Sequence, residues 1–357
     1  MDDINKKSKE ELMRNLKPAG AYLDSLDGFQ DLLGTIKQAE NAAKEVLNEK
    51  PKITREVIRK DKEKATEKAD EIITEAEVEE EEPVSVEELL ERLDILIGLH
   101  NIKQSVKSLI NFVRVRKLRE EKELPNPPVS LHMVFTGNPG TGKTTVARIL
   151  SELYKAIGVL SKGQLVEVDR SGLVAGFVGQ TALKTAEVVE SALGGILFID
   201  EAYSLAPETG ALNDFGRESI ETLLKLMEDN RDDLIVIVAG YSEPMERFIS
   251  SNPGLESRFN RYFLFEDYTG KELDEIFSSM CTKSAYVLTD EAREYALEHF
   301  CQLYDYRDLN FGNARHVRNF FENMVTVHSD RVSTLIDHTR EDLTTVILED
   351  LENAAEM

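Results

Sequence analysis

The residues best suited to chemistry lie together in Gly137-Asn-Pro-Gly-Thr-Gly-Lys143-Thr144, which has the spacing of a phosphate-binding loop. Glycines let the backbone curl so that successive N–H groups face an anion, and the helical pattern that follows directs its positive end there. Lys143 would reach the β- and γ-phosphates, and Thr144 would offer its hydroxyl to Mg²⁺. The stretch predicts an ATP site with Mg²⁺ rather than a glycine-rich turn with an accidental lysine. Its expected contact residues are Gly137, Asn138, Pro139, Gly140, Thr141, Gly142, Lys143, Thr144 and Thr145.

A second chemical signal is the carboxylate pair Asp200-Glu201, which follows the apolar run Ile196–Ile199. We expect this run to form the strand directly beside the one that leads into the phosphate loop. Asp200 would then hold Mg²⁺, and Glu201 would polarise a water for attack on the γ-phosphate. The alternative is an acidic pair that merely ends a buried strand, which the phosphate loop earlier in the chain disfavours.

The elements that must position these residues alternate between strand-like and helical patterns. The strand-like runs are Leu131–Phe135, Leu165–Val168, Ile196–Ile199, Leu234–Ala239 and Tyr262–Phe265. Because the central runs are almost purely apolar, we predict an α/β fold with a five-stranded parallel sheet flanked by helices. We divide the chain into a charged N-terminal extension (1–84), helical or partly disordered, a nucleotide-binding α/β domain (85–268) and a small α-helical domain (269–357).

Composition excludes several classes of function. The 357 residues carry a net charge of -24, which disfavours nucleic acid as the main partner. No apolar run approaches the ~20 residues needed to cross a bilayer, and no apolar signal region opens the chain. Cys281 and Cys301 lack the paired spacing of a zinc site and are typical of reduced intracellular thiols. We therefore expect a cytoplasmic protein without nucleic-acid or membrane partners.

From about Ser85 onward the chain resembles the AAA+ ATPases, and more narrowly the CbxX/CfqX family. The segments that carry this resemblance are Leu96-Ile-Gly-Leu99, His132–Thr144, Gly176-Phe-Val-Gly-Gln-Thr-Ala182, Ile196–Tyr203, Val238-Ala-Gly-Tyr241 and Gly312-Asn-Ala-Arg315. The resemblance implies a P-loop AAA+ module with a C-terminal helical lid. It also implies ATP hydrolysis by a homo-oligomeric ring, expected to be a hexamer. It does not cover residues 1–84.

The resemblance also assigns two arginines. Arg258 matches the arginine finger that acts on a neighbouring subunit's nucleotide, with Arg261 as the alternate. Arg258 could instead serve only the start of the strand at Tyr262. Arg315 matches the sensor-2 arginine, which reaches the phosphates from the lid, although an arginine that is merely solvated at a helix start is the alternative.

The resemblance also bears on the adenine contact and on the residue that orients the attacking water. Ile97 and Gly98 would pack near adenine, where apolar contact and close backbone approach are needed. The position that orients the attacking water in many AAA+ proteins is Tyr241 here, a departure from the usual Asn, Thr or Ser that leaves this role open.

The loop Phe177, Val178 and Gly179 resembles the pore loop with which AAA+ remodellers grip polypeptide, unless Phe177 is buried. We therefore expect a ring ATPase that remodels a protein client. The alternative is an ATP-dependent assembly switch or scaffold, which docks partners through residues 1–84 without threading them. The sequence does not identify the client.

Overall fold

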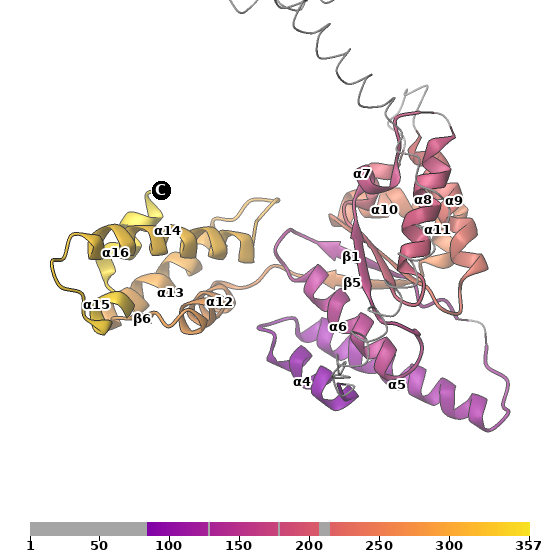
Figure 1. The fold of residues 1–357 in the computed structure, drawn as a ribbon, viewed down its shortest axis with the longest axis horizontal. Coiled ribbons are helices and arrows are strands. Elements are labelled where there is room, and N and C mark those ends of the chain that lie inside the picture. Colours follow the sequence, from indigo (N-terminus) through magenta and orange to yellow (C-terminus); the bar gives the residue numbers. More distant parts are fainter. Residues whose placement is uncertain (1–83, 128, 178, 207–214) are drawn as a thin grey trace, which may run out of the picture. The chain divides into compact units, whose positions relative to one another are not determined.

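The fold is built on a five-stranded parallel sheet. It is seen in a computed structural model that describes residues 84–127, 129–177, 179–206 and 215–357 (Figure 1). Nearly all of the predicted N-terminal extension, and Val178 of the predicted pore loop, lie outside the described residues. The strand order is β2-β3-β4-β1-β5. The strands are β1 (Met133–Gly137), β2 (Leu165–Val168), β3 (Ile196–Ile199), β4 (Ile235–Gly240) and β5 (Arg261–Phe265).

All five predicted runs form strands, but one expected neighbour relation is wrong. The strand that ends before Asp200, β3, does not lie beside β1, because β4 lies between them. Val238 of β4 is aligned with Val134 of β1 on one side and with Ile199 of β3 on the other. Apolar patterns identify strands but not their order, which depends on long-range pairing. Because the sheet is parallel, the carboxyl ends of β1, β3 and β4 still meet at one edge.

Strand residues alternate between two apolar clusters on opposite faces of the sheet. In β3, for example, Ile196 and Phe198 belong to one cluster, whereas Leu197 and Ile199 belong to the other. Helices cover both faces, as expected for a parallel sheet (Figure 1). One face carries α4 (Val86–Ile95), α5 (His100–Glu121) and α6 (Lys143–Ala156). Around the other face lie α7 (Arg170–Leu173), α8 (Gln180–Ala192), the short 3₁₀ helix η1 (Ala202–Leu205), α9 (Gly216–Asp229), α10 (Ser242–Ser250) and α11 (Pro253–Arg258).

The C-terminal part is mainly helical, as predicted. Its helices are α12 (Gly270–Lys283), α13 (Asp290–Asp305), α14 (Ala314–Ser333), α15 (Arg340–Thr344) and α16 (Leu348–Ala355). A capping box opens α12, where the side chains of Thr269 and Glu272 each bond the other's backbone N–H. A parallel pair of two-residue strands, β6 (Val287–Leu288) and β7 (Thr345–Val346), is too short for a sequence pattern to reveal.

Two side findings concern membranes and thiols. None of the helices in the described ranges combines the length and the apolar character that crossing a bilayer requires. Cys281 and Cys301 are both free thiols, as the sequence predicted. Burial raises the pKa of the Cys281 thiol to about 12, so this side chain is uncharged at neutral pH.

An ion pair fastens the last helix of the C-terminal part to α14. Arg331 donates from Nε to Asp350 Oδ1 at 2.7 Å and from Nη2 to Oδ2 at 2.8 Å. The Asp350 side chain is 1% exposed, whereas that of Arg331 is 29% exposed. Asp350 therefore depends on this bidentate partner, because a buried carboxylate without a counter-charge is costly.

Removing the arginine should expose this dependence. We expect Arg331→Leu to lower the free energy of unfolding by about 2 kcal/mol, somewhat less than for a fully buried pair, because Arg331 is partly solvated. Urea unfolding followed by circular dichroism measures the change. Arg340→Leu, at an exposed arginine of the same region, is the matched control. Equal urea midpoints for the two variants would contradict this role of the ion pair.

Candidate nucleotide-binding site

The phosphate loop connects the end of β1 to the start of α6, as its sequence pattern predicted. Gly137, Gly140 and Gly142 have φ values of 141°, 72° and 91°, in the region that side chains disfavour. At Gly137 a Cβ would also lie 2.2 Å from the carbonyl oxygen of Phe265. Thr141 is fully buried and donates from Oγ1 to the carbonyl of Asn138 at 2.8 Å, which braces the loop from within.

Lys143 extends back across the loop from the first turn of α6. Its ammonium donates to the carbonyls of Gly137 at 2.9 Å and Asn138 at 2.8 Å. Burial lowers the pKa of this ammonium to about 8, and the charge of Asp200 opposes that shift. An incoming phosphate would add negative charge to that of Asp200 and favour the charged ammonium further.

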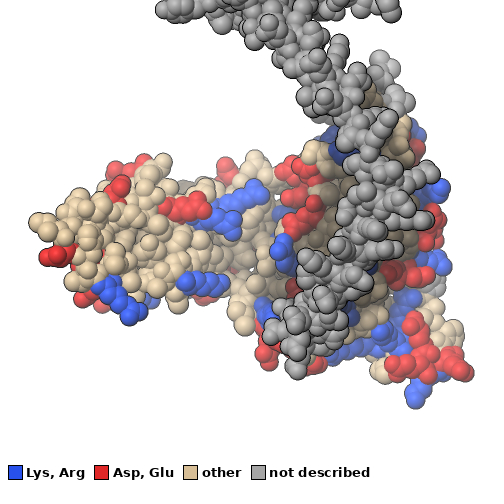
Figure 2. All heavy atoms as spheres, viewed as in Figure 1, with Lys and Arg blue, Asp and Glu red and all other residues tan. Residues whose placement is uncertain are grey.

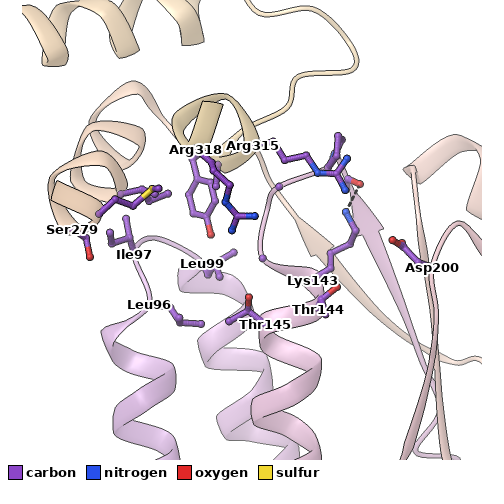
Figure 3. Close-up of a pocket in the computed structure, with 18 of the residues that line it drawn as sticks. Leu96, Ile97, Leu99, Lys143, Thr144, Thr145, Asp200, Ser279, Arg315 and Arg318 are labelled. Carbon is purple, nitrogen blue, oxygen red and sulfur yellow. Dashed lines mark hydrogen bonds between the residues drawn. The ribbon is translucent and has the colours of Figure 1, made fainter. Parts of the chain in front are cut away.

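A cavity of about 510 Å³ opens over the loop, with a polar end and an apolar end (Figure 3). Lys143, Asp200 and Arg315 lie at the polar end, where a triphosphate would bind. The apolar part is lined by Leu96, Ile97, Leu99, Tyr268, Ile276 and Met280. Charge at one end and apolar surface at the other match a nucleotide, whose base needs apolar contact.

Asp200 and Glu201 reach the same cavity from the end of β3. The backbone N–H of Asp200 bonds the carbonyl of Val168, which holds the strand end in register with β2. Glu201 adopts a left-handed conformation at φ 48°, and its N–H donates to Asp200 Oδ1 at 3.0 Å. This costly left-handed conformation ends the strand segment and leads directly into η1.

The donor set suits Mg²⁺. Thr144 and Asp200 line the cavity together and offer hard oxygen ligands. Within the ranges that the structure describes, no three His, Cys, Asp or Glu side chains group as metal ligands. A site with one hydroxyl and one carboxylate fits Mg²⁺, which typically takes its remaining ligands from phosphates and water.

Tyr241 lies where the water-orienting position was expected. It follows β4, caps α10 and lines the cavity with Glu201. Its ring centroid is 6.3 Å from that of Tyr203. Burial, followed by the charge of Glu201, raises the pKa of Tyr203 to about 12. The phenol of Tyr203 is therefore protonated at neutral pH.

The start of α14 brings a second positive helix end to the cavity. Ala314, Arg315 and Arg318 line the cavity, and both arginines are exposed (Figure 3). Sequence reasoning found Arg315 but missed Arg318, although a residue three positions later on a helix shares the same face. Tyr268, also missed, immediately precedes the capping-box threonine, so the start of α12 was its only local signal.

Several predicted contact residues have supporting positions instead. Gly137, Pro139, Gly140, Gly142, Lys143, Thr144, Thr145 and Ile97 line the cavity, whereas Gly98, Asn138 and Thr141 do not. Gly98 has φ 62°, and a Cβ there would lie 2.4 Å from Glu272 Oε1 and 3.2 Å from the ring of Tyr268. Close approach of protein side chains therefore requires glycine at this position. The predicted packing of Gly98 near adenine stays a prediction. The side chain of Asn138 bonds Asp267.

Neither finger candidate reaches this chain's own cavity. Arg258 ends α11 and pairs with Glu228, Nη2 to Oε2, at 3.2 Å, with 27% of its side chain exposed. Arg261 donates to the carbonyl of Ser130 at 3.1 Å and lies over the ring of Phe112. Either arginine can therefore act on a nucleotide only in another copy of the chain.

The predicted pore loop lies between α7 and α8. Phe177 is 71% exposed, which excludes the alternative of a core position. No atom lies within 4 Å of a Cβ placed on Gly176 or on Gly179, so neighbours do not confine the backbone at either site. The loop therefore presents an aromatic ring to solvent from a segment with open space on both sides.

The lowered pKa of Lys143 predicts how binding depends on pH. ATP favours the charged ammonium, so above pH 8 the free site must first take up a proton. The Kd for ATP should rise roughly 10- to 30-fold between pH 7 and pH 9.5. Titration with a fluorescent ATP analogue measures it. Lys143→Arg, which stays charged, should show no such rise, and a constant Kd in the unmodified chain would contradict the assignment.

Comparison with known proteins agrees with this geometry. Residues 133–267 match the family model of the "ATPase family associated with various cellular activities (AAA)", and residues 269–357 match that of the AAA lid domain. Stage V sporulation protein K of Bacillus subtilis is 41% identical over 268 residues, which cover 74% of this chain and 82% of that protein. Protein CbxX (chromosomal) of Cupriavidus necator is 42% identical over 273 residues, or 74% and 84% of the two chains. The chloroplastic ribulose bisphosphate carboxylase/oxygenase activase of Cyanidioschyzon merolae is 40% identical over 269 residues, or 74% and 91%. This chain is thus an ATP-hydrolysing enzyme that belongs to the AAA+ ATPases of the CbxX/CfqX family.

Proposed function

We propose that this protein is a Mg-ATP-driven ring ATPase that remodels a protein client, which it grips with the Phe177 loop. The exposed aromatic ring of Phe177 carries the proposal, because it lies between two glycines without close neighbours and is accessible to a polypeptide. An apolar ring that contacts any polypeptide through its area does not need a specific client sequence. The client is therefore proposed as a class, an unfolded or loosened protein segment, and not as a named protein.

The proposed chemistry divides among residues of the cavity. Lys143 and the loop N–H groups hold the β- and γ-phosphates, while Thr144 and Asp200 hold Mg²⁺. Glu201 accepts a proton from the attacking water. Tyr241 lines the cavity together with Glu201, and which residue orients that water is left open. Arg315 approaches the phosphates from the start of α14 and stabilises the charge that develops there.

Ring assembly would supply an arginine finger, which the chain's own cavity does not receive from Arg258 or Arg261. Arg258 is the proposed finger, and it acts on the nucleotide of a neighbouring subunit in a homo-oligomer, proposed as a hexamer. In the single chain this guanidinium pairs with Glu228. Assembly with ATP would exchange that carboxylate for the γ-phosphate, a stronger and more highly charged partner.

Force transmission to Phe177 has a short route through bonded segments. Glu201 leads directly into η1, whose Ser204 carbonyl accepts a hydrogen bond from the Arg170 guanidinium. Arg170 is the first residue of α7, and the Phe177 loop continues from that helix. A shift at Glu201 on hydrolysis therefore displaces α7 and the loop together.

The charge distribution supports a protein partner. On the part of the face that is coloured by charge in Figure 2, Lys and Arg are interspersed with Asp and Glu. With a net charge of -24, the chain has little attraction for a phosphate backbone. Residues 1–84 are proposed to select the client or its location, because the nucleotide-site elements all follow them.

Mixed rings test the trans-acting arginine. Arg258→Ala should bind ATP nearly normally and hydrolyse it about 10³-fold more slowly or worse. Lys143→Ala should fail to bind ATP. Mixing the two inactive variants should restore phosphate release, because some interfaces then contain an intact lysine opposite an intact arginine. A mixture of Arg258→Ala with the Lys143→Ala/Arg258→Ala double variant is the control and should stay inactive. Failure of the first mixture to recover activity, with assembly intact, would rule out this finger.

Replacing Phe177 tests the grip. Phe177→Ala should keep basal ATP hydrolysis and assembly but lose the stimulation that an unfolded test protein such as casein produces, whereas Phe177→Tyr should retain it. Leu183→Ala, at another exposed apolar side chain (66% exposed), is the matched control. Phosphate release with and without casein gives the comparison. Undiminished stimulation in Phe177→Ala would instead favour an assembly switch that docks partners without threading them.

A further inference from the structure

Asn313, two residues before Arg315, is fully buried beside the phosphate loop. Its Oδ1 accepts a hydrogen bond from the backbone N–H of Tyr268 at 2.8 Å. Because that N–H can only donate, the orientation of the amide is fixed. Its Nδ2 therefore donates to Asp267 Oδ1 at 2.7 Å and approaches the carbonyl of Pro139 at 3.4 Å. One side chain thus links the start of α14 to the phosphate loop and to the segment after β5.

Asp267 is the second member of this polar cluster. Its carboxylate accepts from Asn138 Nδ2 at 2.9 and 3.2 Å, and its side chain is 19% exposed. Arg307, from the C-terminal part, pairs with Oδ2 at 3.5 Å. Hydrogen bonds to a largely buried carboxylate are stronger than those between neutral groups. The carboxylate therefore ties the phosphate loop, through Asn138, to the C-terminal part, through Arg307 and Asn313.

The backbones of the loop and of the α14 start are also in contact. The N–H of Ala314 donates to the carbonyl of Gly140 at 3.3 Å. A Cβ on Gly140 would lie 2.3 Å from the carbonyl oxygen of Gly312. Asn313 itself has φ 47° and ψ −125°, a costly conformation for any residue except glycine. Such strain persists only where surrounding bonds fix it, and here these are the bonds of its own side chain.

We propose that Asn313 and Asp267 are positioning residues for ATP hydrolysis, which hold Arg315 and the phosphate loop in register with each other. The phosphates then meet Lys143 and Arg315 already in place, so that less conformational entropy of these side chains is lost on binding. The inference rests on the nucleotide site proposed above. It adds a direct path by which movement of the phosphate loop reaches the C-terminal part, separate from Arg315's own contact with phosphate.

Asn313→Gly isolates the side chain, because glycine accepts the backbone conformation without strain. The Kd of the full chain for N-methylanthraniloyl-ATP with Mg²⁺ should rise about tenfold, the size expected for lost hydrogen bonds to a charged group. Asn310→Gly makes the same chemical change at an exposed position of the same loop and should leave the Kd unchanged. Asp267→Asn keeps the shape of the side chain but removes its charge, and it should also raise the Kd. This second variant tests the proposal even if Asn313→Gly does not fold.

A double-mutant cycle separates positioning from general support. If Asn313 acts by placing Arg315, then Asn313→Gly should raise the Kd less than about threefold in an Arg315→Ala background, because the group that it positions is gone. If Asn313 had only a structural role, Asn313→Gly would raise the Kd by the same factor with Arg315 present and with Arg315→Ala. That additive result would overturn the proposal, as would an unchanged Kd in both Asn313→Gly and Asp267→Asn. Normal binding by Lys143→Ala would overturn the nucleotide site itself, so the two failures are distinguishable.

Discussion

The rest of the structure depends on one partly buried ammonium at the carboxyl edge of a parallel sheet. Lys143 gives up much of its hydration, which lowers its pKa to about 8, and its ammonium donates hydrogen bonds to the backbone carbonyls of Gly137 and Asn138. The charges of Asp200 and Asp267 stabilise the ammonium, and a bound anion would add to them. The glycines of the loop, the order of the strands and the two helix ends at the cavity all serve to place an anion there.

Around this charge, two bonded routes lead away from the site. One runs from Glu201 through η1 to Arg170 and the exposed Phe177. The other runs from the phosphate loop through Asn313 to α14. The proposal is that a change at the γ-phosphate is transmitted along both routes, to the surface proposed to grip the client and to the C-terminal helices. Each route consists of hydrogen-bonded, adjoining segments, which is the kind of connection that such coupling needs.

Much of this arrangement was predictable because its signals are local. The spacing of residues from Gly137 to Thr144 is enough to identify a phosphate-binding loop, and the apolar content of the strand runs is enough to predict strands. The order of the strands was not predictable, because β4 between β1 and β3 results from long-range pairing. The close contacts of Gly98 with Glu272 and Tyr268 were not predictable either, because both neighbours are far away in sequence. The bonds of Asn313 and Asp267 were missed for the same reason, since neither residue carries a spacing signal for the loop it supports.

The most direct test of the central claim is a cryo-electron microscopy map of the Glu201→Gln chain with Mg-ATP, because loss of the proposed base should preserve bound nucleotide. The account predicts a ring with a triphosphate over Gly137–Thr144, Mg²⁺ between Thr144 and Asp200, and Arg315 together with a neighbour's arginine at the γ-phosphate. A triphosphate held elsewhere, or a nucleotide-saturated monomer in which no second subunit reaches the phosphates, would contradict it.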